Sequence, residues 1–132
     1  MHLLLNLDVP DLDAAEAFYT RAFGLTASRR LGPQVSEMGG ATVPFYLLRK
    51  EAGTQGAAGS LRDYSRHWSP LHVDVVVEDL DAALVQALDA GARQEGGIRD
   101  AEWGRIVTVS DPFGHGWCLL QFLGRGYNEI TS

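Results

Sequence analysis

The sequence predicts an α+β fold made of two βαβββ modules, and three observations lead to this prediction. The motif Asp-Leu-Asp-Ala-Ala at residues 11–15 recurs at residues 79–83, about half a chain later. Apolar residues follow each copy at helical spacing. Alternating or continuously apolar runs before and after each helix predict strands. At 132 residues the chain is long enough to bury a core.

The first module is expected over residues 1–50. Residues 2–9 alternate between apolar and mostly polar side chains, which predicts a strand that ends at Pro10. Asp11 or Asp13 is predicted to cap a helix, with Glu16 as the capping-box partner of Asp13. The helix continues through apolar residues at helical spacing up to a glycine: Ala15, Phe18, Tyr19, Ala22, Phe23 and Gly24. Shorter strands are expected near residues 27–31, 34–38 and 43–50.

A linker and a second module follow. Residues 51–70 are enriched in Gly, Ala and Ser, although Tyr64 and Trp68 suggest that this linker is partly packed. The second module, over residues 71–123, repeats the order of the first, with a helix that begins near Leu80 and ends at Gly91. Its strands are expected at residues 72–77 and near 93–98, 105–110 and 116–123. Since neither module could readily cover its own sheet, residues 1–132 are predicted to form one domain. The polar tail after residue 123 suggests no function.

Composition excludes several function classes. The net charge is −6, so an electrostatic interaction with nucleic acid or an anionic membrane is not expected. No apolar run approaches the roughly 20 residues that span a bilayer. The single cysteine, Cys118, excludes an intrachain disulfide and is typical of a reducing compartment, so a cytoplasmic location is expected.

The most specific motif is Asp-Pro-Phe-Gly-His at residues 111–115, which is followed at once by an aromatic and aliphatic strand. This is the chemistry of a tight turn that enters a buried strand. Together with the internal repeat, it resembles the vicinal oxygen chelate superfamily of glyoxalase I enzymes, bleomycin-resistance proteins and extradiol dioxygenases. The resemblance covers nearly the whole chain. It implies that the two modules form one cup-shaped mixed sheet with flanking helices, and that the protein is a homodimer.

The resemblance also implies where a divalent metal would bind. Matching the motifs places the four ligand positions at Leu4, Tyr46, His72 and Cys118. Leucine donates nothing, and a neutral tyrosine is a poor ligand for most divalent ions. His72 and Cys118 are good zinc ligands, but catalytic zinc usually has three protein ligands. A complete conventional metal site is therefore not expected.

A rebuilt site is the alternative. Strand alternation would place His2 and Asn6 on the same face as Leu4, and Asp74 on the same face as His72. These residues can supply a set of two histidines and one carboxylate, of the kind that binds non-haem iron. If a divalent metal binds, we expect His72 to hold it with His2, Asp74 or Cys118.

Several of these residues also have a structural interpretation. His72 would then be a hydrogen-bonded core histidine, and Cys118 a small apolar core residue. Asp74 would pair with His72 or with an arginine, because a buried carboxylate is costly unless it is paired. Trp103 either leans over the mouth of the cup or is an aromatic residue of a hairpin. His115 is expected to belong to the turn.

Two functions follow from the sequence. The first is a small-molecule-binding protein without a cofactor, similar to bleomycin-resistance proteins, whose acidic charge suits a cationic or neutral ligand. Its predicted ligand-binding residues are His2, Asn6, Tyr46, His72, Asp74, Trp103 and Cys118, with Trp68 and Trp117 as further stacking surface. The alternative is an enzyme of the lyase, isomerase or dioxygenase type. Its candidate catalytic residues are His72 and Asp74, which would act through a rebuilt metal site or as an acid–base pair.

Overall fold

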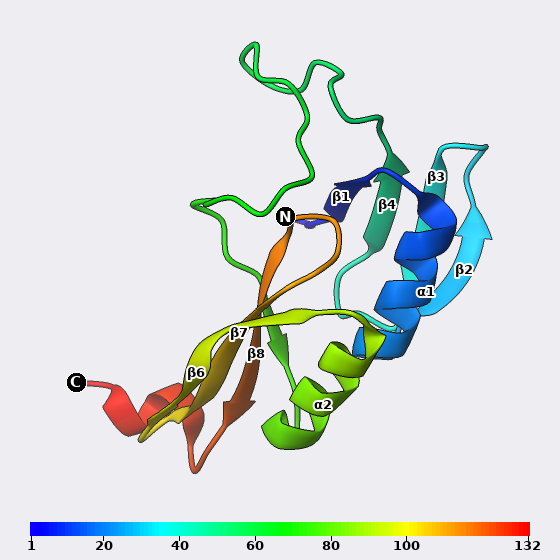
Figure 1. The fold of residues 1–132 in the computed structure, drawn as a ribbon. Helices are drawn as coiled ribbons and strands as arrows, with labels where there is room; N and C mark the ends of the chain where they lie inside the picture. The colour runs from blue at the N-terminus through cyan, green and yellow to red at the C-terminus, as the bar shows by residue number, and fades with distance from the viewer. The chain divides into compact units, whose positions relative to one another are not determined.

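The computed structural model describes residues 1–132 and consists of two compact units, Met1–Ser65 and Arg66–Ser132 (Figure 1). Each unit contains one α-helix and one mixed four-stranded sheet in the order βαβββ. The predicted α+β class and the two βαβββ modules are therefore confirmed. The boundary between the units falls inside the linker predicted over residues 51–70, and the assignment of both to one domain stays a prediction.

The first unit has its strands in the spatial order β1-β4-β3-β2. Strand β1 is parallel to β4, and the other neighbours are antiparallel. The elements are β1 (Leu5–Val9), α1 (Leu12–Phe23), β2 (Thr26–Arg30), β3 (Val35–Gly39) and β4 (Phe45–Arg49). The first strand begins at Leu5 rather than at residue 2. Its sole neighbour β4 begins at Phe45, so the residues before Leu5 have no ladder to join.

The ends of α1 follow from the residues that flank it. Asp11 is the N-cap, and its side chain accepts a hydrogen bond from the backbone N–H of Ala14. The alternative cap at Asp13 is wrong, and Glu16 makes no capping box. The Glu16 carboxylate instead accepts hydrogen bonds from the side chains of Arg30 and Ser36. Gly24, with a φ of 72°, ends the helix as predicted.

The second unit repeats this topology, with the spatial order β5-β8-β7-β6. Its elements are β5 (Asp74–Val76), α2 (Leu80–Ala90), β6 (Arg93–Ala101), β7 (Gly104–Ser110), β8 (Gly116–Phe122) and a 3₁₀ helix η1 (Gly126–Ile130). Strand β5 is shorter than predicted, and the backbone N–H of Leu71 ahead of it donates to the Ser69 hydroxyl. Strand β6 is longer, because it continues across a bulge between Glu95 and Arg99 to form a hairpin with β7.

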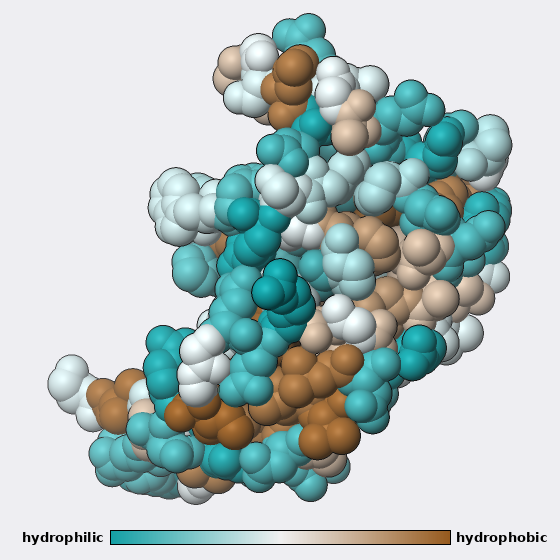
Figure 2. All heavy atoms as spheres, viewed as in Figure 1, coloured by the Kyte–Doolittle hydropathy of each residue, from teal (hydrophilic) through white to brown (hydrophobic).

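In each unit the helix covers one face of its own sheet. The face of β8 toward α2 carries Leu119 and Gln121, and the Gln121 side chain accepts a hydrogen bond from the backbone N–H of Leu80 at the start of α2. Figure 2 shows an apolar patch over α2. The exposed apolar residues of this helix are Val85 and Leu88. No helix in the protein has the length and apolar character needed to cross a membrane.

The two aromatic residues of the linker differ. The Tyr64 hydroxyl donates to the backbone oxygen of Lys50 at 2.6 Å, so this residue is packed down as predicted. Trp68 is 79% exposed, so the expectation that it is partly packed is wrong.

Candidate ligand-binding site

Strand register places a row of polar residues across the second sheet. Residues that are directly opposite in a sheet point to the same face. The row, taken strand by strand through β5, β8, β7 and β6, is Asp74, Cys118, Thr108 and Glu95. Leu119 and Val107, which alternate with this row, are fully buried on the α2 side. The row therefore lies on the face of the sheet turned away from α2, which we call the helix-free face.

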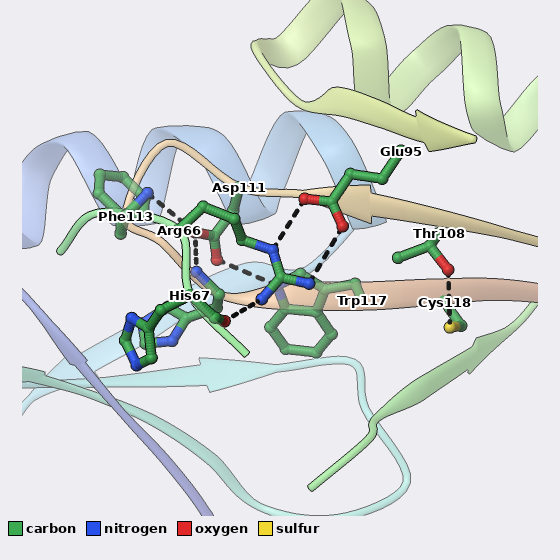
Figure 3. A network of polar contacts seen from close by, with 9 residues as sticks. Arg66, His67, Glu95, Thr108, Asp111, Phe113, Trp117 and Cys118 are labelled. Carbon is green, nitrogen blue, oxygen red and sulfur yellow. Dashed lines mark hydrogen bonds and ion pairs between the residues drawn. The ribbon is translucent and has the colours of Figure 1, made fainter. Parts of the chain in front are cut away.

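A cavity of about 120 Å³ lies beside the two middle residues of this row, Cys118 and Thr108. His72 lines this cavity from the segment just before β5. Figure 3 shows the Thr108 hydroxyl beside the Cys118 thiol, with 3.5 Å between oxygen and sulfur. The residues that line the cavity are Arg66, Trp68, Ser69, Leu71, His72, Val73, Thr108, Gly116, Trp117 and Cys118. His72 and Cys118 thus line the same cavity, and their role in binding a ligand stays a prediction.

Arg66 lies at the edge of the cavity and is fully engaged with its neighbours (Figure 3). Its Nε and Nη2 donate to the two carboxylate oxygens of Glu95 at 2.8 and 3.0 Å, and its Nη1 donates to the backbone oxygen of His67 at 2.6 Å. The guanidinium lies directly against Gly116, where an added Cβ would be 2.4 Å from Nη2. This hydrogen-bonded ion pair lowers the pKa of the Glu95 carboxyl.

The Asp-Pro-Phe-Gly-His turn fixes the start of β8. Asp111 is 6% exposed, and its Oδ1 accepts hydrogen bonds from the backbone N–H groups of Phe113 and His115 at 2.8 and 3.0 Å. Its Oδ2 accepts a hydrogen bond from the indole N–H of Trp117 at 3.0 Å. His115 is part of the turn, as expected. Trp117 is 3% exposed, so its ring is a core residue and offers little stacking surface, contrary to the expectation that it would stack on a ligand.

His72 and Asp74 are the two ionisable groups of this region that have no protein partner. Both side chains are exposed, and neither forms a hydrogen bond or an ion pair. The predicted pairing of Asp74 with His72 or with an arginine is therefore absent. Arg66, the arginine that lines the cavity, is bonded to Glu95 instead.

The first sheet carries an equivalent row on the face turned away from α1. Through β1, β4, β3 and β2 it is Asn6, Tyr46, Glu37 and Arg29. Arg29 donates to both Glu37 oxygens, at 2.9 and 3.2 Å, and Tyr46 lies next to Glu37 in the row. These contacts, with Arg29 first, lower the pKa of Glu37. Asn6 faces Tyr46 in register as Asp74 faces Cys118, which agrees with the equivalence of Tyr46 and Cys118 inferred from the sequence.

The remaining predicted residues lie elsewhere. His2 is exposed and precedes β1, so it is outside the ladder. Trp103 is in the turn between β6 and β7, and its ring centroid is 5.0 Å from that of Tyr127. It does not line the cavity of His72 and Cys118. This position matches the hairpin interpretation of Trp103, and its contact with a ligand stays a prediction.

The side chains present do not fit a conventional metal centre. No group of three or more His, Cys, Asp or Glu side chains lies close enough together to hold a metal ion. The cavity offers His72 and Cys118, which are two ligands where catalytic zinc usually has three. The other two family positions are Leu4, which has no donor atom, and Tyr46, whose neutral hydroxyl is a poor ligand for most divalent ions.

Sequence reasoning missed Arg66, Glu95 and Thr108. Thr108 and Glu95 could have been found by extending the register from Cys118 across the sheet. Arg66 lies in the segment interpreted as a linker, and nothing in the sequence pairs it with a residue 29 positions away.

Comparison with known proteins identifies the family. The sequence signature of the glyoxalase-like domain matches residues 5–120. The chain belongs to the glyoxalase-like domain family. The predicted membership of the glyoxalase, bleomycin-resistance and dioxygenase superfamily is thereby confirmed.

Two relatives illustrate the range of this glyoxalase-like family. An uncharacterized protein of Mycobacterium tuberculosis H37Rv is 32% identical over 124 residues, which cover 88% of this chain and 71% of the relative. The anthracycline biosynthesis protein DnrV of Streptomyces peucetius is 30% identical over 127 residues, which cover 93% of this chain and 42% of DnrV.

Solved structures agree on the fold. The fosfomycin resistance protein FosX of Mesorhizobium loti superposes with a TM-score of 0.71 at 14% identity, covering 99% of this chain and 98% of FosX. TioX of Micromonospora sp. ML1 has a TM-score of 0.71 at 24% identity and covers 93% of this chain and 99% of TioX. At these identities the likeness concerns the glyoxalase-like fold alone.

Proposed function

We propose that this protein binds a small organic molecule on the helix-free face of its second sheet, without a complete conventional metal site. The observation that carries the proposal is the cavity beside two unpartnered groups, His72 and Asp74. Polar groups on a folded surface that have no protein partner are free to bind a ligand. Cys118 and Thr108 are the two residues of the row that line the cavity.

The cavity suggests what the ligand resembles. A site that encloses a whole drug-sized ligand has a volume of roughly 300–1,000 Å³, whereas this cavity has about 120 Å³. It therefore suits one end of a ligand, and the exposed ring of Trp68 suits an apolar or flat part. Since Arg66 is bonded to Glu95 and the net charge is −6, a neutral or cationic ligand fits better than an anion.

The names of two similar proteins support a small-molecule ligand. DnrV is named for anthracycline biosynthesis and FosX for fosfomycin resistance. The proposal extends to a homodimer in the cytoplasm. Further ligand contacts from His2, Asn6, Tyr46 and Trp103 remain part of it as predictions.

An enzyme is the second candidate, and the placement of His72 and Asp74 favours it. His72 comes two residues before Asp74, the first residue of β5, and the two side chains do not hydrogen-bond to each other. Each group can then reach the ligand instead of its neighbour. A histidine and a carboxylate in this arrangement can act as a general acid–base pair.

Fragment screening tests the proposal. A library of neutral, cationic and anionic ring compounds would be screened against ¹⁵N-labelled protein by NMR. Bound neutral or cationic fragments should shift the amide signals of Thr108 and Cys118, and the His72→Ala variant should lose this binding. Asp100→Asn, an exposed change on β6, is the matched control and should bind as wild type. Shifts that are scattered over the surface, or unchanged in His72→Ala, would contradict the proposal.

A further inference from the structure

The segment that leads into β5, residues 66–73, forms one wall of the cavity, and we call it the strap. It has no helix or strand, and its residues are almost all exposed. More than half of the residues that line the cavity belong to it, including Trp68 and His72. The position of the strap therefore determines whether the cavity exists.

The two ends of the strap are attached differently. At its end, the backbone oxygen of Val73 accepts a hydrogen bond of 3.0 Å from the N–H of Cys118, next to the β5–β8 ladder. At its start, Arg66 is joined to the sheet through side-chain atoms, by two hydrogen bonds to Glu95 (Figure 3). Bidentate pairs of this kind add geometric specificity to charge attraction.

The guanidinium of Arg66 packs directly against Gly116. An added Cβ at Gly116 would be 2.4 Å from Nη2 and 2.7 Å from Cζ of Arg66. Gly116 is not among the glycines with positive φ, so an alanine would meet no backbone strain there. The guanidinium is the atom group that a methyl group would displace.

We propose that Arg66 is a positioning residue for the candidate site. Together with Glu95 and Gly116 it forms a clasp that holds the strap over Cys118 and sets the positions of Trp68 and His72. The functional meaning of the clasp rests on the proposed function, because it assumes that the cavity is where the ligand binds. The existence of the clasp does not depend on that assumption.

Cys118 provides a direct measurement, since it is the single cysteine of the chain, is 9% exposed and lines the cavity. The rate at which 5,5′-dithiobis(2-nitrobenzoate) modifies its thiol would be measured under native conditions. Release of the strap in Arg66→Ala should raise this rate at least about tenfold, and Gly116→Ala should do the same. Gly97→Ala, at a glycine with nothing within 4 Å of an added Cβ, is the matched control and should react as wild type.

A double variant separates the clasp from a general loss of stability. If the methyl group of Gly116→Ala acts by displacing Arg66, the Arg66→Ala/Gly116→Ala protein should react no faster than Arg66→Ala alone. The proposal would be overturned if the rate increases of Arg66→Ala and Gly116→Ala multiply in the double variant, or if Gly116→Ala reacts at the wild-type rate. Glu95→Gln, a conservative change, should give an intermediate rate and covers the case in which the other variants fail to fold.

Fragment binding distinguishes this proposal from the function it rests on. Fragments that bind the wild type should bind more weakly to Arg66→Ala in NMR titrations, with Gly97→Ala unchanged. If no fragment binds the wild type while the thiol rates follow the expected pattern, the proposed function fails and the clasp stands. If fragments bind all variants equally, Arg66 does not position the site.

Discussion

The two polar rows occupy equivalent positions in the two sheets, yet they are satisfied in different ways. In the first unit the ion pair forms within the row, because Glu37 accepts two hydrogen bonds from its row neighbour Arg29. In the second unit Glu95 is bonded to Arg66, which comes from outside the sheet. The rest of this row and the nearby His72 are left without an ionic partner.

Equivalent topology therefore does not by itself create a ligand-binding site. The same register aligns four side chains across each sheet, and the ion pair within the first row leaves its charged groups little capacity for a ligand. In the second unit, Arg66 of the strap forms an ion pair with Glu95 and lines a cavity beside Cys118. A ligand site is therefore expected in the second unit, whose row contains no ion pair between its own members.

The largest expected effect concerns Asp111, for which the first unit has no buried carboxylate as a counterpart. Asp111→Ala removes three hydrogen-bond acceptor contacts and leaves the indole N–H of Trp117 buried without a partner. The free energy of unfolding should fall by about 3 kcal/mol or more, measured by urea denaturation. Asp100→Asn, at an exposed position, is the control, and an equally small change in both would show that the turn does not organise β8.

The helix caps should behave alike in the two units, which sharpens the comparison. Asp11 and Asp79 are both N-caps, and each accepts a hydrogen bond from the backbone three residues on. Asp11→Ala and Asp79→Ala should each lower the free energy of unfolding by about 1 kcal/mol. A large difference between them in the same denaturation experiment would mean that the modules are not equivalent in their helices either.

Acid should weaken the ion pairs of both rows. Hydrogen bonding to arginine lowers the pKa of Glu37 and of Glu95 below the ordinary value of 4.5. A carboxyl with a lowered folded-state pKa stabilises the protein above its unfolded pKa, and this stabilisation is lost as the pH falls through the folded-state value. Stability measured from pH 6 to pH 3 should decline less steeply in Glu37→Gln and in Glu95→Gln than in wild type. Slopes identical to wild type would contradict these ion pairs.

The smallest stability effect is expected at His72, which is exposed and has no protein partner. His72→Ala should change the free energy of unfolding by no more than about 0.5 kcal/mol. The divalent-ion content of protein purified without a metal-affinity tag should stay the same, as measured by elemental analysis. Loss of a stoichiometric metal from this variant would show that a site has been rebuilt around His72.

Much of the fold was predictable because local chemistry determines it. The repeated aspartates cap both helices, glycines end them, and the Asp111 turn starts β8. These features depend on spacing along the chain, which a sequence displays directly.

The parts that could not be predicted depend on contacts between distant residues. Glu16 suited a capping box, but the arginine at residue 30 competes for its carboxylate. Arg66 lies in a segment whose composition indicates a linker, and its bonds to Glu95 depend on the folded sheet. Asp74 suited an ion pair, but the nearby arginine was already engaged.

The claim that the ligand binds at the second row and not at the first can be tested with one variant in each unit. A neutral or cationic fragment that binds the wild type would be titrated against His72→Ala in the second unit and Tyr46→Phe in the first. The account predicts that His72→Ala raises the dissociation constant at least about tenfold, which corresponds to 1.4 kcal/mol, and that Tyr46→Phe changes it less. An unchanged dissociation constant for His72→Ala, with a tenfold rise for Tyr46→Phe, would place the ligand on the first row and contradict the account.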